Sequence, residues 1–289
     1  GENLGNYKIV YDIIMKELYD YPFRFRFLDC LICEGILIKN IIRNEEFIDI
    51  TYQRLKDYLF VKYTLNDIED IDLKIEFDKN GKLYELIENS NEDLLDMLSI
   101  FIPEKYSIEL YEIISSDLKG DYSIVHSFIS SLKWRNKSLN ERVFDYINKY
   151  VLNECLDYFL ETLIILAPIE NHLLNANKTH EFLFKQNLAD RDACWTIFLQ
   201  EEYNEDSPIN FMFNFAFSEN FSIYSEKSIK LSAIMIAWFL TSTNKKLRDL
   251  STNALVNLLK NHIDILIDLL KKFENVNDAY VYERLFAVA

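Results

Sequence analysis

The sequence predicts a mostly α-helical fold, an α-α superhelix that carries one small β-hairpin near its N-terminus. Three observations predict it. Glycine occurs only 5 times and proline only 4 times in 289 residues, fewer turn residues than β-sandwiches, barrels or parallel sheets need. Hydrophobic residues make up 49% of the chain, enough for a substantial core. Apolar residues recur at the helical period of 3.6 along most of the sequence.

The first segment, residues 1–52, is predicted to contain two helices followed by a hairpin. Gly35, the usual type of residue after a helix C-terminus, closes the second helix. A polar turn then separates two apolar runs that are typical of paired strands. Helix, helix, hairpin is the order at the end of a winged-helix domain, and this segment is therefore interpreted as a winged-helix remnant. The predicted elements are helices at residues 7–20 and Leu28–Glu34, and strands at Ile36–Ile41 and Phe47–Tyr52.

Residues 53–225 are predicted to form an irregular helical region. It begins with a helix at Tyr52–Tyr63. The acidic segment Asn66–Leu83 is interpreted as an exposed loop with a short strand pair or irregular stretch. Further helices are predicted, one ended by Pro103 and one capped by Asp190. They span Leu94–Ile102, Ile108–Leu118, Val125–Lys133, Asn140–Val151, Glu154–Leu166, His180–Asn187, Asp190–Glu201 and Asn210–Ser218.

Residues 226–289 show the clearest periodicity and are predicted to form HEAT-like helical repeats. Short polar breaks that supply helix N-caps separate the stripes, and one helix pair buries its apolar face only against stacked neighbours. The last helix, from Asp278, has no end signal, so we expect the repeats to be truncated and to expose an apolar surface that the full-length protein or a second copy covers. The stripes are Ile229/Ala233/Ile236/Leu240, Leu247/Ser251/Ala254/Leu258, Ile263/Leu266/Leu270/Phe273 and Val281/Leu285/Val288.

Charge and cysteine usage restrict the classes of function. The net charge is −16, from 31 basic and 47 acidic residues, which disfavours non-specific nucleic-acid binding. No apolar run is long enough to span a bilayer, and the N-terminus does not resemble a signal peptide. Four cysteines without framework spacing suit a reducing compartment. We therefore expect a cytoplasmic protein without membrane contact.

A search for catalytic, metal and cofactor motifs predicts none. The five glycines fit no phosphate-binding loop. Cys30 and Cys33 form C-x-x-C without a second pair and are interpreted as core cysteines on a buried helix. The four histidines lack metal-ligand spacing and are interpreted as solvated or capping residues. The acidic segment fails the calcium-loop pattern because Ile87 stands where a bidentate Glu is required.

Basic clusters are the remaining candidates for a partner site. One surrounds Trp134, where an aromatic among cations is able to stack on a base, although a helix end also favours basic residues. A second lies at the start of a predicted repeat helix, and Asp249 and Arg284 occupy positions that typically bridge adjacent helices. Partner binding and inter-helix bridging both stay open. The clusters are Arg24/Arg26, Lys133/Trp134/Arg135/Lys137 and Lys245/Lys246/Arg248/Asp249 with Arg284.

Several stretches resemble a known family. Ile48–Leu65 is similar to the segment that closes the winged-helix region of bacterial STAND-type, NACHT-like NTPases, with Gln53, Arg54, Asp57 and Leu59 at matching positions. Leu94–Leu110 and Phe128–Arg135 also resemble sequence segments of this family. The most specific match is Ala237–Leu259, similar to W-F-L-T-S-x-N-x-x-L-R-D-x-x-x-x-A-L-V-x-L-L, followed by D-P-Y-V-x-E-R-L-x-A-V-A. The chain departs from these patterns at Ile50, Lys56, Ser251–Asn253 and Ala279.

The resemblance implies a prokaryotic, often antiviral, defence protein with a nucleotidase core, a winged helix and a helical sensor. This chain would supply the end of the winged helix and the beginning of the sensor. Because the nucleotide-binding residues are absent from it, no ATPase activity is carried over. The first hypothesis is therefore a non-catalytic scaffold that recognises a protein ligand. A free-standing module that binds nucleic acid, and an unrecognised enzyme, remain as alternatives.

Overall fold

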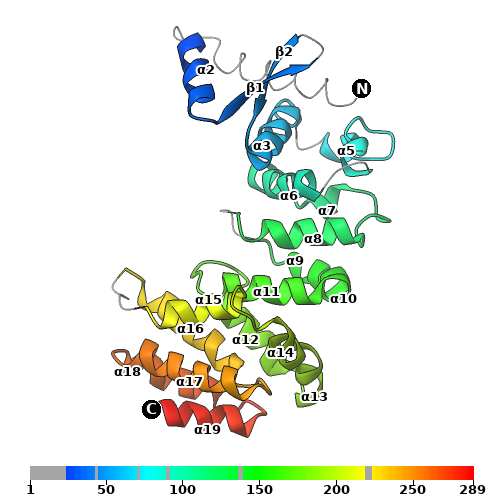
Figure 1. Ribbon diagram of the computed structural model, residues 1–289. Coiled ribbons are helices and arrows are strands. Elements are labelled where there is room, and N and C mark those ends of the chain that lie inside the picture. The colour runs from blue at the N-terminus through cyan, green and yellow to red at the C-terminus, as the bar shows by residue number, and fades with distance from the viewer. Residues whose placement is uncertain (1–23, 43–44, 70–71, 89–91, 136–138, 219–222) are drawn as a thin grey trace. The chain divides into compact units, whose positions relative to one another are not determined.

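The computed structural model describes residues 24–42, 45–69, 72–88, 92–135, 139–218 and 223–289. Within these residues the chain is mostly helical and has a two-stranded antiparallel sheet (Figure 1). The chain forms two compact units, Gly1–Arg135 and Asn136–Ala289. The helix predicted at residues 7–20 lies outside the described residues. The three-part division of the chain stays a prediction.

The described part of the first unit begins with the predicted second helix and the hairpin, and both are confirmed. Helix α2 (Arg24–Cys33) is followed by a turn at Gly35, whose φ of +70° favours glycine. Ile36 N then donates to Leu31 O at 2.9 Å and closes the turn. Strands β1 (Leu37–Ile42) and β2 (Glu45–Ile50) pair in the register Leu37↔Ile50, which brings two apolar residues together at the base of the hairpin.

A small core forms between α2 and the hairpin. It contains Leu28, Leu37, Ile48 and Ile50, and partly buried Leu31, Ile32 and Leu59 pack against it. The two cysteines of the C-x-x-C motif do not belong to this core, because both are exposed. The prediction of core cysteines was wrong for a geometric reason. Residues two and five positions after Leu28 lie on the far side of a helix whose apolar stripe faces the hairpin.

Six helices complete the described part of the first unit. Helix α6 lies between α3 and α8 and packs against both. Their bounds are α3 Gln53–Thr64, α4 Leu73–Glu76, α5 Tyr84–Glu88, α6 Glu92–Tyr106, α7 Leu110–Ile113 and α8 Tyr122–Ser131.

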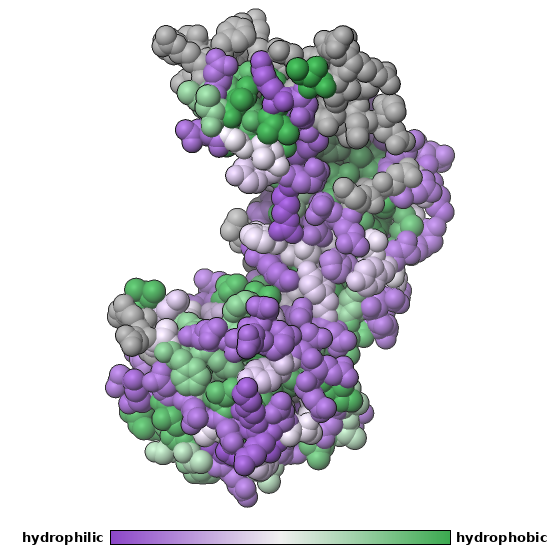
Figure 2. Space-filling view, in the orientation of Figure 1, coloured by the Kyte–Doolittle hydropathy of each residue, from purple (hydrophilic) through white to green (hydrophobic). Residues whose placement is uncertain are grey.

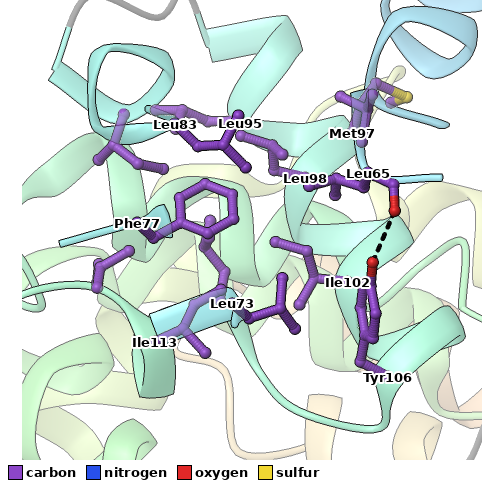
Figure 3. Packing of buried hydrophobic residues seen from close by; sticks show 14 of the residues in the cluster. Leu65, Leu73, Phe77, Leu83, Leu95, Met97, Leu98, Ile102, Tyr106 and Ile113 are labelled. Atoms are coloured by element: carbon purple, nitrogen blue, oxygen red, sulfur yellow. Dashed lines mark hydrogen bonds between the residues drawn. The ribbon is translucent and has the colours of Figure 1, made fainter. Parts of the chain in front are cut away.

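The acidic segment Asn66–Leu83 belongs to the core of this unit and is not an exposed loop. Figure 3 shows Leu73 and Phe77 pointing into the same cluster as Leu98 and Ile102 of α6. Leu73 is 0% and Phe77 1% exposed. The described part of the segment forms helical turns without a strand pair. The segment is polar overall, but its apolar residues Leu73, Phe77 and Leu83 are buried in the core. These three side chains bury one side of the segment.

Pro103 does not end its helix, contrary to the sequence prediction. Helix α6 continues through it to Tyr106. Ile102 is fully buried, and the Tyr106 hydroxyl lies 2.8 Å from the carbonyl oxygen of Leu65, as the dashed line in Figure 3 marks. These anchors on either side of the proline offset the one backbone hydrogen bond that it removes. The predicted helix Ile108–Leu118 is also shorter, because only Leu110–Ile113 is helical.

The second unit is helical throughout its ordered elements. Two π-helical turns, η1 and η2, interrupt predicted helices. The helix predicted to begin at Asp190 starts earlier, because the Asn187 side chain accepts from Asp190 N and serves as the cap. The elements are α9 Val143–Tyr146, η1 Ile147–Val151, α10 Leu152–Glu154, α11 Leu156–Leu166, α12 Ala176–Lys185, α13 Leu188–Arg191, η2 Asp192–Thr196, α14 Ile197–Glu202, α15 Pro208–Ala216, α16 Glu226–Phe239, α17 Lys245–Leu259, α18 Ile263–Phe273 and α19 Ala279–Val288.

Helix α16 is the central element of this unit (Figure 1). Every residue from 231 to 240 is buried, because α12, α17 and α18 pack around the helix. An aromatic core surrounds its C-terminal half. Trp238 and Phe239 are fully buried, Trp195 stacks on Phe239 at 6.2 Å, and the Trp195 indole donates to the Trp238 carbonyl oxygen at 3.1 Å. The unit therefore has one well-packed centre built on α16.

The helices predicted within residues 226–289 are confirmed as helices. Asn244 caps α17 and Asp278 caps α19, each through its side-chain oxygen. On α18, however, the buried residues are Ile265, Leu266, Leu269 and Phe273, and Ile263 is 64% exposed, so its stripe was placed slightly wrong.

The apolar stripe of the terminal helix faces its own chain. Val281 and Leu285 are both 0% exposed, and α19 packs against α17, α18 and α16. The expectation that these side chains await a missing partner was therefore wrong. The large hydrophobic side chains exposed on this helix are Phe286, at 56%, and Tyr280, at 38%. No helix in the described residues is long and apolar enough to cross a membrane.

Candidate functional site

Arg135, a candidate for partner binding, is an internal residue of the first unit. Its guanidinium donates through Nη1 to both carboxylate oxygens of Glu109, at 2.7 and 2.8 Å. It also donates through Nε and Nη2 to the Ser131 hydroxyl, at 3.0 and 2.7 Å. The two charged side chains are 3% and 9% exposed. Such a buried pair orients the chain after α8 and offers no charge to a ligand.

Trp134 is exposed, at 58%, and the guanidinium carbon of Arg54 lies 5.5 Å from its ring centroid. Arg54 also reaches Asp96 of α6 at 3.6 Å. Asp96 in turn accepts from the Ser130 hydroxyl at 2.7 Å. These contacts join α3, α6 and α8. Gln53, by contrast, acts within α3, where it donates to Asp57 one turn later at 2.8 Å.

The second basic cluster divides into bridging and exposed residues. Arg248 donates to the carbonyl oxygens of Ser242 and Thr243, both at 2.7 Å, and to the Tyr280 hydroxyl at 3.1 Å. Asp249 pairs with Arg284 at 3.2 Å. These residues join α17 to α19. Lys245 and Lys246 are exposed on the first turn of α17. The side chains of Arg24 and Arg26, and all of Lys137, lie outside the described residues.

His180 is buried in the aromatic core, although the sequence suggested a solvated or capping role. Its Nδ1 accepts from the Trp238 indole at 3.2 Å, and its ring lies 4.9 Å from that of Phe273. Burial, reinforced by the positive charge of Lys272, lowers the pKa of His180 to about 4. The imidazole is therefore neutral at physiological pH. His172 is half-buried and does not cap a helix: its Nδ1 accepts from Leu174 N at 3.1 Å in the turn before α12, whose cap is Asn175.

An apolar groove opens on the second unit between α11, the α11–α12 connection, α15 and the start of α16. It has a volume of about 670 Å³. Its rim carries large hydrophobic side chains that are exposed to solvent. These include Phe211, 59% exposed on α15, and Ile169, 45% exposed after α11. The full set is Ile164, Ile165, Pro168, Ile169, Glu170, Asn171, Pro208, Phe211, Met212, Phe215, Tyr224 and Ser228, which we call the apolar groove.

A second groove adjoins it on the other side of Glu170, which lines both. It has a volume of about 550 Å³ and lies between α12, α16 and α18. Four lysines and two acidic residues line it, in a chain whose overall charge is strongly negative. The lining residues are Glu170, Asn177, Lys227, Lys230, Leu231, Asp268, Lys271 and Lys272, which we call the lysine groove. The face of this unit that Figure 2 shows mixes hydrophilic and hydrophobic side chains.

The charges in the lysine groove are only partly compensated. Lys230 pairs with Asp268 at 2.6 Å. No described residue forms an ion pair or hydrogen bond with the ammonium groups of Lys227, Lys271 or Lys272. Lys272 is half-buried, and burial together with the charge of Lys230 lowers its pKa. An anionic group placed between these lysines would therefore relieve repulsion that the folded chain contains.

Neither groove is visible in the sequence. Lys227 and Lys230 are separated from Lys271 and Lys272 by about one helical hairpin of sequence, so no local cluster signals them. The adjacent pair Lys271–Lys272 was visible in the sequence, but nothing local distinguishes it from a solvated helix end. Phe211 looked like one of many core aromatics. In the part of the chain that the structure describes, no group of three or more His, Cys, Asp or Glu residues is placed to hold a metal ion.

The two adjoining grooves offer contacts for binding, with apolar surface on one side and a cluster of lysines on the other.

Comparison with known proteins identifies no family: no protein-family model, no curated protein and no solved structure matches the chain.

Proposed function

We propose that the chain is a non-catalytic helical module that recognises a protein ligand through the apolar groove of its second unit. The observation that carries the proposal is the exposure of large hydrophobic side chains around one depression. Phe211, Ile169, Tyr224 and Ile165 are between 40% and 59% exposed and line the same groove. Contiguous apolar surface of this kind marks interaction sites, and an apolar groove between helices accepts apolar side chains of a partner segment.

The wider role that we propose is regulation of a STAND-type NTPase. The resemblance at Ile48–Leu65 and Ala237–Leu259 supports it, and so does the order of α2, the hairpin and α3, which suits the end of a winged helix. Helices α16 to α19 would continue as a HEAT-like superhelix in the cytoplasm. A ligand that binds one state of this module more tightly than another would shift the NTPase between a resting and an assembling state, by as much as the difference in affinity.

The test of ligand recognition is a display selection of random peptides against the whole chain, with counter-selection against the Phe211→Ser variant. Phe286→Ser is the matched control, because Phe286 is similarly exposed, at 56%, but lies on α19 outside the groove. We expect enriched peptides whose affinity falls at least about tenfold in the Phe211 variant and is unchanged in the Phe286 variant. Peptides that ignore the Phe211 change would refute recognition by this groove.

The proposed connection to an NTPase has a separate test. The reading frame that encodes this segment is expected to encode a phosphate-binding loop, G-x-x-x-x-G-K-[ST], upstream of it. A start codon immediately before the segment would refute this part of the proposal and leave the peptide-binding part intact.

Nucleic-acid binding is a second candidate, and the lysine groove is the observation that favours it. Four lysines gather there on the surface of an acidic chain. We rank it lower because the same groove contains Asp268 and Glu170, and because a net charge of −16 repels a polyanion at longer range.

A further inference from the structure

We propose that the apolar groove and the lysine groove bind one and the same partner segment, and that this segment carries acidic side chains next to apolar ones. The inference rests on the proposed function and adds the chemistry of the ligand. It depends on the fact that the two grooves are neighbours on one unit.

Glu170 and the start of α16 join the two grooves. Glu170 lines both, and its carboxylate accepts a hydrogen bond from the hydroxyl of Ser225, the cap of α16. Ser228 lines the apolar groove, whereas Lys227 and Lys230 of the same helix line the lysine groove. Ser228 also donates to the carbonyl oxygen of Pro168 at 2.9 Å, which fixes the end of α11 against α16. A ligand that lies along this border meets both surfaces at once.

The charge of the lysine groove selects an acidic ligand. Lys227 and Lys271 are exposed and Lys272 is half-buried, and none of the three forms an ion pair or hydrogen bond with a described residue. Carboxylates of a ligand would supply the missing partners. Because Lys272 is partly shielded from water, its pairing would be stronger than that of an exposed lysine. The chain as a whole carries a net charge of −16 and repels an acidic ligand at longer range, so local complementarity directs an acidic segment to the lysine groove.

The apolar groove argues for a protein segment and against a nucleic acid. A bound nucleic acid needs a row of cations that follows its phosphates. The described lining of the apolar groove contains no Lys or Arg but one carboxylate, Glu170. The positive surface therefore stops where the apolar surface starts. An amphipathic peptide has the complementary division, with apolar anchors on one part of its surface and carboxylates on the other.

The test uses the peptides enriched by the selection described above and measures their binding to the whole chain by fluorescence anisotropy. Lys227→Glu/Lys271→Glu reverses two exposed charges of the lysine groove, so it is not expected to disturb folding. Lys74→Glu/Lys82→Glu is the matched control. It changes the net charge equally, at two exposed lysines of the first unit. Lys272→Met removes the half-buried charge and retains the stem of the side chain.

We expect the enriched peptides to contain Asp or Glu together with Leu, Ile or Phe. Their affinity should fall at least about tenfold in Lys227→Glu/Lys271→Glu and several-fold in Lys272→Met, and change less than about twofold in the control. Raising the salt concentration from about 50 to 200 mM should weaken binding to the wild-type chain more than to the double variant.

Three outcomes would overturn the inference, and they can be told apart. Peptides that need Phe211 but bind the lysine variants normally would leave protein recognition standing and refute the acidic chemistry. Peptides enriched in Lys and Arg would do the same. A fluorescent single-stranded oligonucleotide whose binding depends on Lys227 and Lys271 but not on Phe211 would assign the lysine groove to nucleic acid. Failure of the proposed function is distinct, because no enriched peptide would then respond to Phe211→Ser.

Discussion

His180 makes the stability of the second unit depend on pH between about 4 and 6.5. The imidazole is buried against Trp238 and Phe273 and accepts the Trp238 indole hydrogen at Nδ1. Protonation would place a charge in this core next to Lys272 and would convert the acceptor into a donor. This is why the folded pKa, about 4, lies below the ordinary value of 6.5.

The sign and size of the effect follow from linkage. Between the folded and unfolded pKa values the unfolded chain binds more protons, so stability is fully present above about pH 6.5 and is lost as the pH falls towards 4. One pKa unit corresponds to about 1.36 kcal/mol, and lowering the pH from about 7.5 to 5.0 is therefore expected to cost about 2 kcal/mol through His180 alone. Stopping at pH 5.0 keeps the protein above its isoelectric point, near 4.7.

The assay is urea unfolding followed by tryptophan fluorescence, since the buried Trp195 and Trp238 report on this core. His180→Asn is the comparison, because the asparagine oxygen is able to accept the Trp238 hydrogen bond but does not titrate. Its free energy of unfolding should lie closest to that of the wild type at about pH 5 and fall further below it at about pH 7.5. The reasoning is refuted if the difference between the two proteins changes by less than about 0.5 kcal/mol over this range.

Further predictions concern the two units separately. Arg135→Met leaves the Glu109 carboxylate buried without its cation and should lower the free energy of unfolding by about 3–5 kcal/mol in urea titrations; a loss below about 1 kcal/mol would contradict the buried pair. Leu285→Ala should cost about 2–5 kcal/mol because it opens a cavity, whereas Phe286→Ala should stay within about 0.5 kcal/mol, and equal costs would show that α19 does not pack as described. Asp249→Asn should lower the free energy of unfolding by less than about 1 kcal/mol, because the ion pair between Asp249 and Arg284 is partly exposed. This loss should become smaller in high salt.

Local signals in the sequence determined most of the longer helices and the hairpin. The period of 3.6, the caps Asn244 and Asp278 and the positive φ of Gly35 act between residues a few positions apart. For this reason α16, α17 and α19 and the β-hairpin could be predicted without knowledge of their neighbours. The bridging alternative for Arg248, Asp249 and Arg284 also came from local spacing, and these residues do join two helices.

Tertiary packing decided which surfaces are buried and which are free. Cys30, predicted to be buried, is exposed, and His180, predicted to be solvated or capping, is buried. Burial depends on what packs against a helix face and not on the face alone. Pro103 remains inside α6 because distant contacts hold both sides of it.

The candidate site depends on tertiary structure even more strongly. Its apolar half joins α11 to α15, and its charged half joins α16 to α18, so neither half exists as a sequence motif. The sequence alone specified the helices and the apolar and charged residues that they carry. Only the fold brought Lys227 and Lys230 to Lys271 and Lys272, because residues some forty positions apart meet when long-range packing places their helices side by side.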